Sequence, residues 1–109
     1  MTRGAIIGLM LLLNACLPAR SIKELLGDPD RFDGKDVRIV GGVTESVGAF
    51  GYGVYGISDG TGRLTVVSQM GGGTPRAGAK VRVEGTFQSG FMMGTSRIAM
   101  LVAKQWGSP

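Results

Sequence analysis

Histidine is absent from this chain of 109 residues. Its absence removes the side chain that most often acts as a general base near neutral pH and that most often binds metals. Ordinary hydrolytic triads, zinc sites and histidine-ligated haem therefore lack their usual components. We expect no enzymatic activity, no resident cofactor and no metal site.

Cysteine is nearly absent, because the chain contains only Cys16. A single cysteine cannot form an internal disulfide, so in an exported protein it needs another explanation. Charged residues are also sparse, at 18% of the chain. Residues 17–36 contain four basic and five acidic side chains, whereas residues 37–109 contain seven basic and three acidic ones. Such moderate basicity favours anionic lipid or another polyanion nearby, but it also fits a simple role in solubility.

An uncharged apolar run, GAIIGLMLLL, follows Arg3 and ends at Leu13. Ten helical residues rise about 15 Å, roughly half the hydrocarbon core of a bilayer. A basic residue before a short apolar run is typical of a signal peptide. The run leads into Leu13-Asn14-Ala15-Cys16, which resembles the lipobox of bacterial lipoproteins, with a less usual residue in Asn14.

This resemblance implies cleavage between Ala15 and Cys16 and acylation of Cys16, which would attach the protein to a membrane essentially permanently. It divides the chain into a signal peptide (1–15), a lipidated tether (16–20) and a folded domain (21–109). Residues 17–20 reach at most about 14 Å, so we expect the domain to lie against the membrane surface. Leu17 occupies the position where a signal for retention in the inner membrane would have Asp. We therefore favour attachment to the outer membrane, with the domain facing the periplasm. The alternative is that Cys16 is an ordinary buried thiol near the end of a normal signal peptide.

The remaining sequence predicts one short helix followed by strands. Ser21 and Glu24 form a capping-box pattern for a helix that ends at Gly27. Five strands are predicted at residues 37–47, 50–57, 64–69, 80–88 and 97–105, joined by glycine-rich turns. The fourth strand alternates, with one face formed by Val81, Val83 and Phe87 and the other by Arg82, Glu84 and Gln88. The pair Gly41-Gly42 is expected to bend or bulge the first strand. The last segment also fits a helix, but a strand would close the sheet. The predicted fold is all-β, a five-stranded OB-fold barrel preceded by a short helix.

Several turn motifs support this fold by resemblance. Four segments are similar to those of small exported bacterial OB-fold proteins, which are related to the tRNA-anticodon-binding type of OB domain. These segments are Gly34-Lys35, the hairpin from Tyr55 to Gly62, the turn from Pro75 to Gly78 and the strand from Val81 to Gly85. Such motifs specify a fold and say little about activity. The segment 70–79 is too rich in glycine and proline for the helix that many OB folds carry there. The resemblance also extends to a periplasmic haem chaperone that uses a histidine, and the lack of histidine excludes that activity in its known form.

OB folds bind ligands on the face of their second and third strands, beside the loops that join strands one to two and four to five. The candidate ligand-binding residues here are Phe50, Tyr52, Tyr55, Arg63, Phe91, Met92 and Met93. The aromatic residues could stack on bases beside the arginines at 38, 63, 82 and 97, or they could fill and cap a small barrel. We predict that the residues from Phe91 to Met93 lie in a loop, Ser89–Thr95, which either packs over the barrel end or contacts a membrane or protein.

Carboxylates offer little chemistry by themselves. The four aspartates at positions 28, 30, 33 and 36 loosely resemble an oxygen-ligand cation site, but they lack the EF-hand glycine and glutamate. Solvated, turn-forming aspartates explain them better, and Asp59 fits a turn equally well.

We therefore expect a non-enzymatic, membrane-anchored envelope lipoprotein that binds a protein or small ligand near the membrane. The alternative is binding of single-stranded nucleic acid by the OB-fold face. A third possibility is an enzyme that uses carboxylates and tyrosine.

Overall fold

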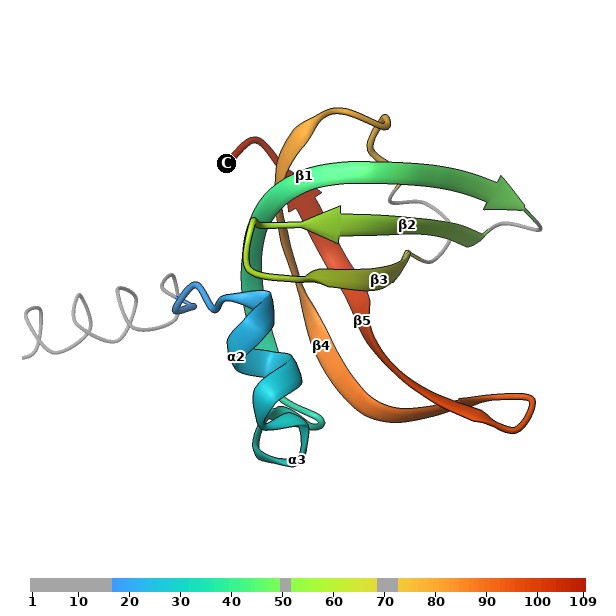
Figure 1. Ribbon diagram of the computed structural model, residues 1–109. Helices are drawn as coiled ribbons and strands as arrows, with labels where there is room; N and C mark the ends of the chain where they lie inside the picture. Colours follow the sequence, from blue (N-terminus) through green and yellow to red (C-terminus); the bar gives the residue numbers. More distant parts are fainter. Residues whose placement is uncertain (1–16, 50–51, 69–72) are drawn as a thin grey trace, which may run out of the picture.

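The computed structural model describes residues 17–49, 52–68 and 73–109. The elements are α2 (Ile22–Gly27), α3 (Pro29–Phe32), β1 (Asp36–Ala49), β2 (Tyr52–Ser58), β3 (Arg63–Ser68), β4 (Lys80–Met93) and β5 (Ser96–Gly107). The strands form a closed barrel in the order β1-β2-β3-β5-β4 (Figure 1). The predicted all-β, five-stranded barrel with a preceding helix is confirmed, and the last segment is a strand.

The two helices lie against one end of the barrel. Ser21 caps α2, because its Oγ accepts a hydrogen bond from the Glu24 N–H at 3.1 Å. The Glu24 carboxylate pairs with Arg20 at 3.0 Å instead of turning back to the cap. The predicted end of α2 at Gly27 is confirmed, but Pro29 then starts α3, which sequence analysis did not predict. Proline at a first helical position is a signal for such a start. Within the described residues, no helix has the length and apolar character needed to cross a membrane.

β1 changes its neighbour part-way along its length. Its first half pairs with β4 and its second half with β2, and Gly42 has a partner in both strands. Figure 1 shows that β1 curves strongly along its course. A side chain at Gly41 would meet the backbone carbonyl of Ser58, so β2 approaches too closely for a larger residue. The glycine pair therefore lies where β1 passes from one neighbour to the other.

A β-bulge follows the glycine pair. The register with β2 shifts between Val43 and Ser46, so that Thr44 and Glu45 lie opposite Gly56. A bulge of this kind increases the local twist and re-aims side chains. It sets which residues of β1 point outward near the end of the strand.

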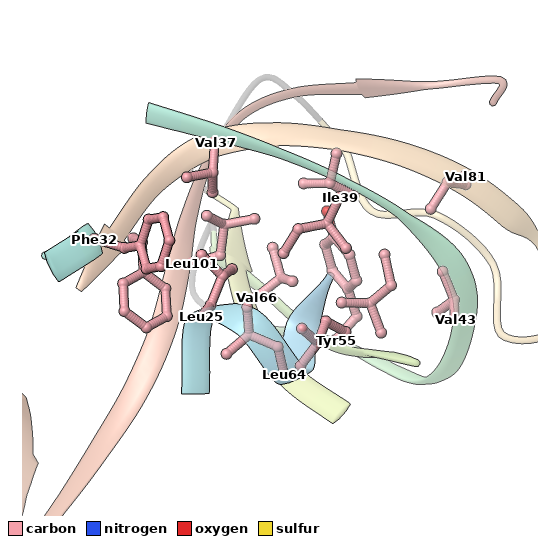
Figure 2. Packing of buried hydrophobic residues seen from close by; sticks show 14 residues of the cluster. Leu25, Phe32, Val37, Ile39, Val43, Tyr55, Leu64, Val66, Val81 and Leu101 are labelled. Atoms are coloured by element: carbon pink, nitrogen blue, oxygen red, sulfur yellow. The ribbon is translucent and has the colours of Figure 1, made fainter. Parts of the chain in front are cut away.

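The core fills the barrel and continues beneath the helices. Alternate residues of β4, namely Val81, Val83 and Phe87, are buried as predicted. Figure 2 shows Leu25 and Phe32, from the two helices, packed among strand residues of the same apolar cluster. The helices therefore cover one end of the barrel instead of forming a separate unit.

β4 and β5 extend beyond the barrel as a two-stranded arm (Figure 1). β4 pairs with β1 only as far as Thr86, and β5 pairs with β3 from Met100 to Ala103. Farther out the two strands pair only with each other, as in Phe91 with Ile98. The predicted loop Ser89–Thr95 is therefore wrong, because residues 89–93 continue β4. The turn falls at Gly94, where φ is +65°.

Candidate ligand-binding face

The outward side of β2 carries Tyr52 and Val54, which are 56% and 43% exposed. Residues two apart on a strand point to the same side, which explains why these two share a surface. Val47 of β1 is paired with Val54 and is 62% exposed. We call the surface formed by Val47, Tyr52 and Val54 the apolar face. The two valines were not among the predicted ligand-binding residues, although the spacing of two from Tyr52 indicates Val54.

Tyr55 lies on the opposite side of β2, in the core. Its side chain is 1% exposed, and Figure 2 shows it among the buried apolar residues. Burial raises the pKa of Tyr55 to about 12. Its hydroxyl has no hydrogen-bond partner among the described residues. The interpretation of Tyr55 as a barrel-filling residue therefore applies, and the candidate role in ligand contact does not fit its position.

Arg63 lies beside the apolar face and is paired with a carboxylate. Its guanidinium contacts Glu45 of the bulge, and both side chains are 58% exposed. A Cβ at Gly56 would meet Thr44 Oγ1 and the Arg63 guanidinium, so the glycine makes room for the arginine to cross β2. The bulge supplies the acid that neutralises Arg63, a pairing that the sequence alone did not indicate.

Asp59 organises the β2–β3 turn and joins it to α2. Its Oδ1 accepts hydrogen bonds from the N–H groups of Thr61 (2.9 Å) and Gly62 (3.2 Å). Its Oδ2 accepts from the Ile22 N–H at 2.9 Å. Burial alone would raise its pKa, but hydrogen bonds from Thr61, Ile22 and Gly62 hold the pKa of Asp59 below its usual value. The predicted turn role is confirmed, and the link to the helix is an addition to it.

The other candidate residues are only partly described. Met92 lies on the arm and is 55% exposed. Phe91 and Met93 are placed by backbone pairing with Ile98 and Ser96, while their side chains are outside the described part of the structure. Phe50, Ala15 and Cys16 also lie outside the described residues.

Many solved structures resemble this barrel. One is a chain of a replication protein A heterotrimer bound to single-stranded DNA, with a TM-score of 0.58 and 21% identity over 70% of this chain and 57% of that one. Another is asparaginyl-tRNA synthetase from Pyrococcus horikoshii complexed with asparaginyl-adenylate, with a TM-score of 0.66 and 19% identity over 85% of this chain and 22% of that one. A third is an OBody bound to hen egg-white lysozyme, with a TM-score of 0.60 and 12% identity over 84% and 94% of the two chains.

The closed strand order and these similarities agree. The chain has an OB fold. This chain spans 57% of the replication protein A chain and 22% of the synthetase chain. The sequence matches no protein-family model and no curated protein. The similarities therefore define the architecture of the domain.

The outer side of β1 and β4 in the OB barrel forms a second, charged surface. On this outer side, alternating with apolar core residues, lie Arg38 and Val40 of β1 and Lys80, Arg82 and Glu84 of β4. Glu84 is only 8% exposed. We call these five residues the basic face. Glu84 Oε1 accepts from Arg82 Nε at 3.1 Å and from Gln105 Nε2 at 2.8 Å, while its Oε2 lies 3.4 Å from Arg38 Nη2. Arg38 and Arg82 therefore gather around Glu84 rather than Tyr52, and the side chain of Arg97 is outside the described part.

Two of the four aspartates of the α2–β1 region, Asp33 and Asp36, form separate hydrogen bonds within the OB fold. Asp36 Oδ1 accepts from Thr86 at 2.8 Å and its Oδ2 from Lys104 at 2.9 Å. Asp33 accepts from the Ser89 N–H at 2.9 Å. Within the described residues, His, Cys, Asp and Glu side chains form no cluster of three that could hold a metal ion. Asp33 also borders an open recess of about 490 Å³ at the base of the arm.

Proposed function

We propose that this chain is a non-enzymatic bacterial envelope lipoprotein, anchored through Cys16, whose OB barrel binds a protein or small ligand near the membrane. The apolar face is the observation that carries the binding role, because Val47, Tyr52 and Val54 are exposed on adjacent strands. Exposed apolar surface on a small domain is typical of an interaction site. The lipobox resemblance supports the anchor and the location facing the periplasm, with the outer membrane favoured.

A protein partner fits this face better than a small ligand or a nucleic acid. The aliphatic side chains of Val47 and Val54 offer contact area without hydrogen-bond donors, and Tyr52 is a residue type enriched at protein interfaces. The positive charge of Arg63 is matched by Glu45. An OBody with a similar barrel binds lysozyme, which supports the use of this fold for protein recognition.

In-cell photo-cross-linking tests the binding role. A photo-reactive residue at Val54 should yield a discrete adduct with one protein, and the same residue at Leu26, an exposed apolar position on α2, should not. Tyr52→Ala should weaken binding of the isolated partner by about 1–2 kcal/mol, as expected for an interface tyrosine. Equal cross-linking at both positions, or unchanged affinity of the Tyr52 variant, would contradict the proposal.

Single-stranded nucleic acid is the second candidate partner. The likeness to a replication protein A chain bound to single-stranded DNA favours it, and Tyr52 offers a ring for stacking. Phosphate contacts make such binding weaken steeply as salt rises. Fluorescence anisotropy with single-stranded oligonucleotides at low and high salt distinguishes the candidates. Salt-sensitive binding that Tyr52→Ala reduces would establish this alternative, and its absence would remove it.

A further inference from the structure

The basic face concentrates positive charge on one side of the barrel. It contains three basic side chains and one carboxylate, because Arg38 and Arg82 share Glu84. Lys80 is exposed and has no ion-pair partner among the described residues. Near the apolar face, by contrast, Arg63 has its own acid in Glu45. Of these two surfaces, the outer side of β1 and β4 therefore carries the excess positive charge.

The chain enters the domain beside this basic face. Ala19 forms a parallel bridge with Arg38, and the Arg20 N–H donates to the Arg38 carbonyl at 2.8 Å. Cys16 precedes Ala19 by three residues, which span at most about 10 Å when extended. An acyl chain on Cys16 would therefore hold the basic face within about one Debye length of the lipid headgroups.

We infer that the basic face lies against an anionic phospholipid surface, with lipid phosphates paired to Arg38, Lys80 and Arg82. This inference rests on the proposed lipid anchor. Arginine guanidinium groups match the geometry of phosphate oxygens, and Glu84 already holds two of them in place. Each basic residue close to such a surface adds to its attraction. Val40, 38% exposed between these cations, then lies at the headgroup level.

This placement also orients the apolar face. In Figure 1 the first described residues (blue) and the far ends of β1 and the β4–β5 arm lie on opposite sides of the barrel. With the basic face on lipid, Tyr52 and Val54 remain accessible to a partner in the periplasm. The tether and the basic face thus together hold the domain so that the apolar face points away from the membrane.

Thiol accessibility provides the test, with two matched exposed valines. The full chain is recovered from bacterial membranes as the parent, as Val40→Cys and as Val54→Cys, and each is inserted into the outer leaflet of preformed vesicles. A membrane-impermeant maleimide measures the labelling rate. We expect Val40→Cys to react at least about fivefold more slowly than Val54→Cys on phosphatidylglycerol-containing vesicles, with a smaller difference on phosphatidylcholine alone. Lys80→Cys is a second reporter on the same face.

Charge reversal supplies the control. Adding Lys80→Glu to the Val40→Cys protein should raise the labelling rate at position 40 about fivefold on anionic vesicles. Adding Lys35→Glu instead, at an exposed lysine outside the basic face, should leave that rate unchanged. Equal labelling at positions 40 and 54 on anionic vesicles, or protection at 54 alone, overturns the inference while leaving the anchor intact. Labelling of the parent at Cys16 overturns the anchor itself, since an acylated sulfur cannot react.

Discussion

At the scale of single residues, Tyr55 shows how one position on a strand decides a side chain's role. It follows Tyr52 by three positions, an odd number, so the two rings lie on opposite sides of β2. Tyr52 is exposed and Tyr55 is buried. Both tyrosines were predicted as candidate ligand-binding residues because both lie on the second strand, although the period of two already places them on opposite sides. The odd spacing between the two tyrosines was therefore the stronger indication of which one is buried.

Removing the Tyr55 hydroxyl should stabilise the fold. The hydroxyl is buried without a hydrogen-bond partner among the described residues, and such a group costs about 1–3 kcal/mol. We expect Tyr55→Phe to raise the free energy of unfolding by about 1 kcal/mol in urea denaturation. Tyr52→Phe, at an exposed position, should leave it within about 0.5 kcal/mol of the parent. A destabilised Tyr55→Phe protein would show that the hydroxyl has a partner.

Asp59 should be the most sensitive carboxylate of the chain. Asp59→Ala removes the acceptor for the N–H groups of Ile22, Thr61 and Gly62 together. We expect a loss of about 1–3 kcal/mol in unfolding free energy. Asp30→Ala, at an exposed position in α3, is the control and should change little. Similar losses in both variants would argue against the link between α2 and the turn.

At the scale of secondary-structure elements, the sequence predicted the side-chain alternation within a strand. It did not predict the features that depend on pairing with neighbouring strands. The alternation in β4 correctly grouped the buried Val81, Val83 and Phe87 on one face, and Asp59 with the following glycines correctly indicated a turn. The length of the β4–β5 arm depends on where β1 and β3 stop pairing, which no local pattern records. The Glu45–Arg63 pair likewise depends on a bulge produced by the register between β1 and β2.

The adjacent glycines of β1 provide a matched test of strand packing. A Cβ at Gly41 would meet the Ser58 carbonyl, whereas one at Gly42 would meet nothing within 4 Å. We expect Gly41→Ala to cost about 1–3 kcal/mol in thermal unfolding, because a backbone group cannot easily move away. Gly42→Ala should be neutral or slightly stabilising. If both substitutions had the same effect, β2 would not approach β1 as closely as described.

At the scale of the whole molecule, three carboxyl groups make the fold sensitive to acid but not to mild pH changes. Burial opposes the shift in Glu84, yet hydrogen bonds from Gln105 and Arg38 and the charges of Arg38 and Arg82 hold its pKa below the usual 4.5. A hydrogen bond from Lys104 and another from Thr86 lower the pKa of Asp36 below 3.8, and the pKa of Asp59 is also lowered.

A lowered pKa in the folded state stabilises the protein above the unfolded value, and this stability is lost as pH falls. Unfolding free energy should therefore be nearly constant between about pH 5 and 7, where the chain has no histidine to titrate. It should decline as pH drops below 4.5 and through 3.8, the usual values for these side chains. Urea denaturation across this range checks the curve, and a marked change between pH 5 and 7 would contradict it.

The role of the molecule depends on how the barrel is attached. A lipid on the sulfur would explain three features together. These are the short connection from Cys16, the bridge of Ala19 with Arg38 and the exposed position of the apolar face. Mass spectrometry of the intact chain from bacterial membranes tests this most directly. We expect a mature protein that begins at Cys16 and carries the added mass of a diacylglyceryl group and an N-acyl chain. A protein that retains Met1, or one whose residue 16 is an unmodified thiol, would contradict it.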